Sequence, residues 1–311
     1  MFGQYLKALR LEKGLTQKEL CTKLNLAESG LASIDSVTLS RWERGVTEPH
    51  ATKAIKVLRI LTDDLRPYLR TISVEEKEDI ISRLAYEKFQ SINAGAAAAS
   101  YTLPENNQAV DRVIKKEINP DLDKHVFENM KNFLHTSKAG YPGLTNLDFE
   151  ALYRNKKLIL SLYVNPDSQA IVGHNLAVLF RAKDLTNALI TPHDSLPFKK
   201  ITTYGEKKPL AICSLSRFAT TLNTFNTIHS DFVDYIANHS NIHFYYHYLN
   251  SHFLFDYFET IGAEKVGYDT LDPHGVVKIG TKAYRNCLFK IESEVILTRP
   301  EILRLLQRKQ K

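Results

Sequence analysis

The sequence is poor in cysteine and in long apolar runs. Its three cysteines, Cys21, Cys213 and Cys287, are far apart, odd in number and without C-x-x-C spacing. They are expected to be reduced thiols, so a disulfide framework, a zinc site or thiol redox chemistry is not indicated. No apolar run approaches the roughly 18 residues that a membrane span needs, and no apolar leader with a small-residue cleavage site is recognisable. The sequence therefore predicts a cytoplasmic protein without a metal.

The overall composition is that of an ordinary globular chain. Hydrophobic residues make up 43% of the sequence and charged residues 24%, with 13 glycines and 11 prolines. These proportions exclude a collagen-like, intrinsically disordered or coiled-coil protein. The length of 311 residues is more than one hydrophobic core usually serves, so two domains are expected.

Positive charge is concentrated at the two ends of the chain, whose formal net charge is +6. Residues 1–70 contain 12 lysines and arginines against 8 aspartates and glutamates, and residues 299–311 contain five basic residues against one acidic residue. Positive ends around a nearly neutral middle are typical of nucleic-acid binding. Basic segments also occur on inert surfaces, so the charge pattern needs support from motifs.

Residues 1–70 predict a series of short helices. Thr16-Gln-Lys-Glu19 is a capping box, in which a hydroxyl and a carboxylate accept hydrogen bonds from backbone amides at a helix start. Asp35 is the expected amino-terminal cap of the next helix, and Leu39 and Trp42 would form the apolar side of that helix. The segment therefore predicts a small helical domain.

Two motifs in this segment resemble the helix-turn-helix domain of the Cro and phage-repressor class, the XRE type. They are G-L-T-Q-K-E-L at 14–20 and V-T-L-S-R-W-E-R-G-x-x-x-P at 37–49. In that family the third helix lies in the major groove and its first residues read base edges, while the second helix begins against phosphates. The resemblance implies a double-stranded DNA operator as partner, bound by a homodimer.

The resemblance also implies roles for individual residues. The groove-facing or base-reading set is Ser36, Val37, Thr38 and Arg41, and the residues expected near phosphates are Gln17, Lys18 and Arg44. The alternative for the groove-facing set is a solvated helix face. Arg10 and Glu43 match family positions that form a buried ion pair between helices, so they are expected to support the fold.

One segment of the helix-turn-helix departs from the family pattern. Residues 25–32 form an apparent insertion between the second and third helices, where the family usually has a tight turn. Either this segment lengthens the DNA footprint or it is a surface loop that the fold tolerates. The sequence leaves both alternatives open.

Beyond the first seventy residues the pattern indicates a connector and then a new domain. Residues 74–91 predict an amphipathic helix, which either packs on the first domain or pairs in a dimer, and 94–107 predict a linker. Strands rich in β-branched and aromatic residues are expected at 157–164, 170–181, 209–218, 242–250, 264–268 and 282–291, with helices at 219–239 and 251–261.

This order of elements resembles the core of the GNAT acyltransferases. The run F-D-Y-F-E-T-I-G-A-E-K-V-G-Y at 255–268 resembles the closing helix and strand of that core, and S-L-S-R-F-A at 214–219 is similar to a segment of the acyl-homoserine-lactone synthases. The resemblance implies acyl-CoA or a related acyl ligand. The candidate ligand-binding residues are Ser214, Ser216, Arg217 and Tyr257.

Two parts of the GNAT chemistry are missing from the sequence. GNAT enzymes hold the pyrophosphate of acyl-CoA on a glycine-rich turn after the fourth strand, whereas residues 217–221 contain no glycine. Phe258 stands where the family has a general-acid tyrosine, although Tyr257 is adjacent, and a phenylalanine ring cannot donate a proton. No catalytic residue is therefore assigned, and a degenerate domain is favoured over an active enzyme.

The histidines of the second domain do not predict a metal site. His243 and His247 are four residues apart on an expected strand, which separates them by about 13 Å at roughly 3.3 Å per residue. One ion cannot be bound across that distance. These side chains are expected to lie on one face of the strand.

The fold class predicted is an α-helical helix-turn-helix domain followed by a GNAT-like mixed sheet with flanking helices. The expected boundaries are a DNA-binding domain at 1–70, a connector and linker at 71–110, the acyltransferase-like domain at 111–298 and a basic tail at 299–311. The predicted function is a dimeric, DNA-binding transcriptional regulator whose second domain senses a small-molecule effector or mediates association. The alternatives are an active acyl-CoA-dependent acyltransferase that the helix-turn-helix targets to DNA, and a partner-binding protein without a small ligand.

Overall fold

The structure is a computed structural model that describes residues 2–74, 80, 83, 112–136, 143–191, 194–205, 208–249, 251–268, 271–275 and 277–308. Contacts divide the chain into two units. The helical unit comprises the described residues of Met1–Lys77, Val233–Asn241 and Ser293–Lys311, and the sheet unit those of Glu78–Phe232 and Ile242–Glu292. Most of the predicted connector and linker, residues 71–110, lies outside the described residues.

The helical unit contains the predicted short helices. They are α1 (Phe2–Glu12), α2 (Gln17–Ala27), the 3-10 turn η1 (Ser29–Leu31), α3 (Ser36–Glu43), α4 (Ala51–Arg59), α5 (Arg66–Leu69), α13 (Ser293–Leu297) and α14 (Pro300–Arg308). Thr16 and Glu19 form the predicted capping box, and the Asp35 carboxylate accepts a hydrogen bond from the Thr38 amide at 2.7 Å. Both predicted helix starts are confirmed.

Aromatic and aliphatic side chains form the core of the helical unit. The Phe2 ring contacts the rings of Trp42 and Tyr68, with centroid distances of 5.9 and 6.0 Å. Leu39 and Trp42, predicted as the apolar side of α3, are buried. Gly3 lies so close to α3 that a Cβ atom built on it would be 1.8 Å from the Trp42 carbonyl oxygen. Glycine is required there because no larger side chain fits between α1 and the end of α3.

The carboxy-terminal segment differs from the predicted basic tail. Residues 300–308 form α14, in which Leu303, Leu305 and Leu306 are buried. α14 packs against α5 and α13 packs against α4. The sequence-based interpretation weighed the charge of this segment and missed the spacing of its leucines, which places them on one side of a helix.

The sheet unit is built on a seven-stranded sheet, counted over the described residues. Its order is β1-β2-β3-β4-β5-β9-β6, and β7 and β8 form a separate pair. The strands are β1 (Ile114–Lys116), β2 (Leu158–Val164), β3 (Ile171–Arg181), β4 (Leu210–Ala219), β5 (Ile242–Leu249), β6 (Glu264–Tyr268), β7 (Val277–Ile279), β8 (Lys282–Tyr284) and β9 (Cys287–Glu292). Strands β4 and β5 are parallel, and the other neighbours are antiparallel.

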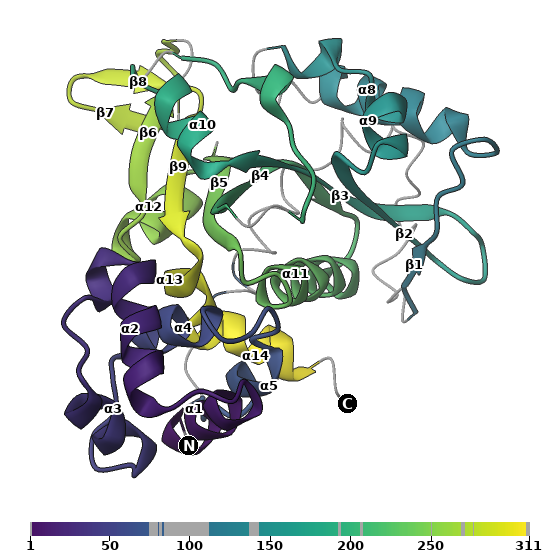
Figure 1. Ribbon diagram of the computed structural model, residues 1–311. Helices are drawn as coiled ribbons and strands as arrows, with labels where there is room; N and C mark the ends of the chain where they lie inside the picture. Colours follow the sequence, from purple (N-terminus) through teal and green to yellow (C-terminus); the bar gives the residue numbers. More distant parts are fainter. Residues whose placement is uncertain are drawn as a thin grey trace. The chain divides into compact units, whose positions relative to one another are not determined.

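Helices cover both faces of this sheet, as Figure 1 shows for α11 on one side and α8 and α9 on the other. The helices of the unit are α8 (Lys124–Thr136), η2 (Leu144–Asn146), α9 (Phe149–Arg154), α10 (Ala182–Ala188), η3 (Phe198–Lys200), α11 (Leu222–Ala237) and α12 (His252–Thr260). The last residues of α11, from Val233, belong to the helical unit.

The predicted fold class, a helical domain followed by a mixed sheet with flanking helices, is confirmed. The expected strand at 282–291 is two strands, β8 and β9, because residues 285–286 interrupt it. Helices α8 and α9 were not predicted. Among the described residues, no helix combines the length and the apolar character needed to cross a membrane.

Candidate DNA-binding face and ligand site

Helix α3 presents an exposed stripe opposite its buried side. Val37, Arg41 and Arg44 follow one another at i, i+4 and i+7, so their side chains point to the same side of the helix. All three are exposed, and Val37 keeps 55% of its surface accessible. Ser36 is also exposed and Thr38 is half-buried. Of the four residues expected in the groove, Ser36, Val37 and Arg41 are thus accessible and Thr38 is partly accessible.

The residues expected near phosphates divide into two groups. Lys18 is exposed at the start of α2, whereas the Arg44 side chain turns back and donates a hydrogen bond to the Ser40 carbonyl oxygen at 3.2 Å. Gln17 donates its side-chain amide to the Glu43 carboxylate at 2.8 Å. Gln17 therefore holds α2 against α3, and a contact with a phosphate would be a second role of this residue.

Behind α3 lies the predicted ion pair. One edge of the Arg10 guanidinium, Nε and Nη2, donates to the two carboxylate oxygens of Glu43 at 2.5 and 2.9 Å, and the side chains are 9% and 3% exposed. Burial would raise the pKa of the Glu43 carboxyl, but hydrogen bonds from Arg10 and Gln17 outweigh burial and lower that pKa. The same hydrogen bond raises the pKa of Arg10. Arg10 and Glu43 hold α1 and α3 together.

The insertion is an ordered connection between α2 and α3. It prolongs α2 to Ala27 and continues as η1, with Leu31 and Ile34 buried. The Leu31 amide donates to the Glu28 carbonyl at 2.9 Å, and the Ile34 amide donates to the Leu31 carbonyl at 3.1 Å. The Glu28 carboxylate forms an ion pair with Lys56 of α4 at 3.0 Å.

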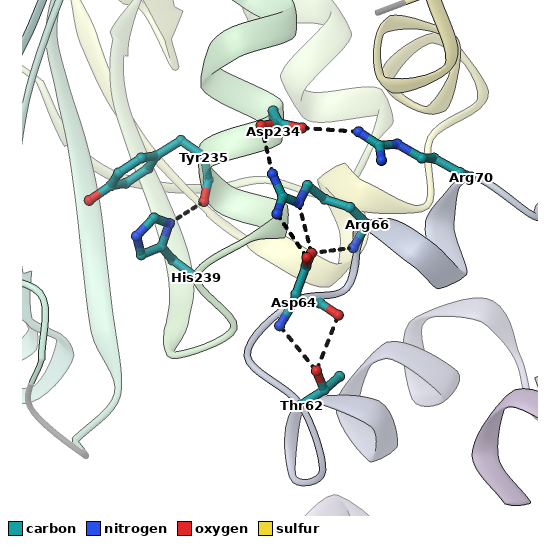
Figure 2. Close-up of polar contacts among 7 residues, drawn as sticks. All are labelled: Thr62, Asp64, Arg66, Arg70, Asp234, Tyr235 and His239. Atoms are coloured by element: carbon teal, nitrogen blue, oxygen red, sulfur yellow. Dashed lines mark hydrogen bonds and ion pairs between the residues drawn. The ribbon is translucent and has the colours of Figure 1, made fainter. Parts of the chain in front are cut away.

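Helix α5 is held to the last turns of α11 by charged residues (Figure 2). Asp234 accepts a hydrogen bond from Arg66 at 3.2 Å and forms an ion pair with Arg70 at 3.5 Å. Arg66 also bonds to Asp64, and the Leu65 amide donates to the Ala237 carbonyl at 2.8 Å. These contacts lie within the helical unit, which therefore includes a residue, Asp234, that is 168 positions further along the chain than Arg66.

In the sheet unit, a polar cluster lies between the sheet and α11. Arg217 donates to the Asn175 side-chain oxygen at 3.1 Å and to the Ser214 hydroxyl at 3.5 Å, and its guanidinium lies 3.9 Å above the Phe232 ring. On the same face, the Tyr163 hydroxyl donates to the Asp231 carboxylate at 2.9 Å. Burial raises the pKa of both Tyr163 and Tyr245, whose hydroxyls therefore remain protonated.

Ser216 lies on the opposite face of β4 from Ser214. The register with β3 shifts between these serines, since Ser214 pairs with Ala177 and Ser216 with Leu176, so Leu215 is the extra residue of a β-bulge. The Ser216 hydroxyl is 2.8 Å from His174 Nε2, and the His174 ring contacts Phe133 of α8. The sequence grouped the two serines, but a regular two-residue alternation does not hold across a bulge.

Tyr257 and Phe258 of α12 also differ in environment. Phe258 is buried and its ring contacts Phe289 and Tyr245, with centroid distances of 5.6 and 6.4 Å. Phe258 is therefore a core residue of the sheet unit. Tyr257 is half-buried and contacts the Phe258 ring.

Strands β4 and β5 stop pairing before they end. Their parallel register runs from Leu210 and Ile242 to Ser214 and His247, while β4 continues along β3 as far as Ala219. Beyond Ser214 the two strands therefore diverge. The sequence analysis did not identify His174 and Asn175 of β3, which pair with β4 beyond Ser214. Two polar residues inside the otherwise apolar run of β3 could have indicated a functional position.

The turn from β4 into α11 does not fit a pyrophosphate in the way the acyltransferase resemblance implies. The Thr220 amide and hydroxyl both donate to the Val172 carbonyl, at 2.9 and 3.0 Å. The Thr221 hydroxyl accepts from the Thr224 amide at 3.1 Å and so caps α11. The Thr220 and Thr224 amides are thus engaged by a backbone carbonyl and by a side chain, whereas a glycine-rich turn would offer its amides to phosphate oxygens. Over the described part of the chain, no group of three or more potential metal ligands is found.

The helices, caps and buried ion pair of the amino-terminal segment have the arrangement of a helix-turn-helix. Residues 6–62 match the helix-turn-helix family. Among curated proteins, none matches the chain.

Similar solved structures cover a little more than half of this chain. Arabidopsis thaliana NAA60 in complex with a bisubstrate analogue is 13% identical, with 58% of this chain and 98% of that chain covered and a TM-score of 0.36. The same protein in complex with acetyl-CoA is 14% identical with the same coverage and TM-score. A bacterial toxin is 10% identical, with 60% and 93% covered and a TM-score of 0.32.

Proposed function

We propose that this chain is a sequence-specific, DNA-binding transcriptional regulator. The observation that carries the proposal is the exposed stripe of α3, placed opposite a buried side that the Arg10–Glu43 pair and Trp42 fix against α1. A rigidly held helix with accessible short and basic side chains suits the major groove. Ser36, Val37, Thr38 and Arg41 would face base edges, and Gln17, Lys18 and Arg44 would lie near phosphates.

Arg41→Ala is expected to weaken specific binding by about 1–3 kcal/mol if the guanidinium contacts a base. Lys18→Ala is expected to weaken binding to all sequences alike and to reduce the salt dependence, because a phosphate contact releases counterions. Fluorescence anisotropy with a duplex selected from a random library, and with an unrelated duplex, measures both effects. Equal losses on the two duplexes in the Arg41 variant would show that Arg41 contacts phosphate.

The regulator is proposed to bind DNA as a homodimer. One small helical unit offers few base contacts, and two copies on two half-sites multiply the specificity of each. Light scattering at tens of micromolar is expected to report a dimer. A monomer, both with and without the selected duplex, would reject this assembly.

The sheet unit is proposed to sense a small acyl ligand or to mediate association, without transferring acyl groups. The divergence of β4 and β5 beside Ser214 and Arg217 supports a ligand there, whereas the capped Thr221 turn and buried Phe258 argue against catalysis. Arg217 is the proposed anion contact, and Ser214, Ser216 and Tyr257 are the further candidate ligand residues. Since Ser216 lies on the other face, it would reach only a ligand that enters between the strands.

Incubation with acetyl-CoA and longer acyl-CoA esters is expected to release no free thiol, because catalysis needs a phosphate cradle and a proton donor. Ligand binding without turnover is expected to raise the melting temperature, and Arg217→Ala to abolish that rise. Thiol release that Tyr257→Phe removes would support the alternative, an acyltransferase targeted by its helix-turn-helix.

A further inference from the structure

A buried carboxylate, that of Glu294 in α13, holds α13 to α4 within the helical unit. Glu292 is the last residue of β9, and Ser293 and Glu294 follow it directly as the start of α13. Glu294 is 3% exposed, and its two oxygens bond to different cations. Arg59 donates to one oxygen at 2.6 Å, and Lys56 lies 3.0 Å from the other. Arg59 also donates to the Ser293 hydroxyl at 2.5 Å.

Lys56 connects this carboxylate to the insertion. Its ammonium group lies 3.0 Å from Glu294 and 3.0 Å from Glu28, so one side chain bridges α13 and the segment between α2 and α3. The Lys56 and Glu28 side chains are 23% and 33% exposed, whereas the side chains of Arg59 and Glu294 are 5% and 4% exposed. The Arg59–Glu294 pair, which is the better shielded from water, is screened by salt less than surface pairs are.

From Glu28 the path to α3 is short and made of hydrogen bonds. The backbone carbonyl oxygen of Glu28 accepts from the Leu31 amide, and the carbonyl oxygen of Leu31 accepts from the Ile34 amide. Ile34, which is 2% exposed, precedes Asp35, the cap of α3. Displacement of Glu28 would therefore be felt at the first turn of the helix that carries Ser36, Val37 and Thr38.

We propose that Glu294 is a positioning residue for DNA recognition. It holds Lys56, Lys56 holds Glu28, and the insertion thereby fixes the start of α3 at the angle that base contacts need. This assignment rests on the proposed DNA-binding function, and it gives the insertion a role that its sequence left open.

The test compares Lys56→Gln and Glu28→Gln with Lys53→Gln in the full chain. Lys53 lies one turn earlier on α4, so the control has the same helix, the same chemical change and the same loss of charge as Lys56→Gln. Glu294→Gln is a fourth variant, but it leaves the buried Arg59 guanidinium without its carboxylate partner. The outcome is therefore judged on the Lys56 and Glu28 variants, which disturb the fold less.

Two readings are taken from each variant. Hydrogen exchange of residues 28–38 is expected to rise several-fold in Lys56→Gln and Glu28→Gln and to stay unchanged in Lys53→Gln. The ratio of affinities for the selected and the unrelated duplex is expected to fall five- to tenfold in the first two variants and less than twofold in the control. The double variant should be no worse than Lys56→Gln alone, because that single variant already breaks the contact with Glu28.

Unchanged exchange and an unchanged affinity ratio in Lys56→Gln and Glu28→Gln would overturn the proposal. Equal effects in Lys53→Gln would also overturn it, because they would reflect charge alone. The hydrogen-exchange measurement needs no DNA, so it tests the positioning of α3 independently of the proposed DNA-binding function. A wild-type chain that binds no duplex would contradict the proposed function instead.

Discussion

Glu43→Ala is expected to lower the free energy of unfolding of the helical unit by about 3–5 kcal/mol, because it leaves the Arg10 guanidinium buried without its carboxylate. Gln17 loses its acceptor in the same variant. The chain has one tryptophan, Trp42, which lies beside this pair, so its fluorescence during urea unfolding reports the helical unit. Glu12→Ala, an exposed change of equal charge, is the control. A loss below about 1 kcal/mol would show that the pair is not a major contact of the fold.

The same variant has a predicted dependence on pH. The pKa of the Glu43 carboxyl is lowered in the folded protein, so the ion pair contributes its full stability above the ordinary glutamate pKa. This contribution is lost as the pH falls through the lowered value. The difference between Glu43→Ala and the wild type is therefore expected to be largest near neutral pH and to shrink in acid. A difference that grows on acidification would contradict the assigned charge state.

Removal of residues 299–311 is expected to unfold the helical unit or to shift its urea midpoint further than Glu43→Ala does. The truncation removes α14, whose Leu303, Leu305 and Leu306 are at most 3% exposed. Each buried leucine contributes roughly 2–5 kcal/mol by comparison with alanine substitutions in other cores. Trp42 fluorescence is again the measurement.

A shorter truncation, of residues 309–311, is the matched control. It removes Lys309 and Lys311 but leaves every residue of α14 in place. If the segment served only as a basic tail, both truncations would leave the unfolding midpoint unchanged and weaken DNA binding. Folding that depends on α14 gives different midpoints for the two truncations.

Specific DNA recognition is thus proposed to depend on segments distant in sequence. Contacts from Asp234 to α5 and from Glu294 to α4 belong to the helical unit. A fragment ending near residue 70, where the sequence places the end of the DNA-binding domain, would lack both carboxylates. Arg59, which is 5% exposed, would then have no contact with Glu294.

The local features of the helix-turn-helix could be predicted from the sequence alone. Thr16 with Glu19 and Asp35 cap helices through atoms within three residues, so neighbouring residues decide the outcome. The buried side of α3 follows from the spacing of Leu39 and Trp42, and several strands follow from β-branched runs. The family motif added the Arg10–Glu43 pair, which spacing could not give because the partners are 33 residues apart.

Other features were decided by tertiary structure, because their contacts join distant residues. The bulge at Leu215 separates Ser214 from Ser216, and it arises from pairing with β3, which no local pattern in β4 encodes. Gln17 is engaged by Glu43 through the packing of α2 on α3. Leucines in a basic segment became the core helix α14 because α5 offered an apolar partner. Sequence determined which residues could form helices, strands and caps, and tertiary packing determined which polar side chains became partners, since that choice depends on distances that the chain sets only when folded.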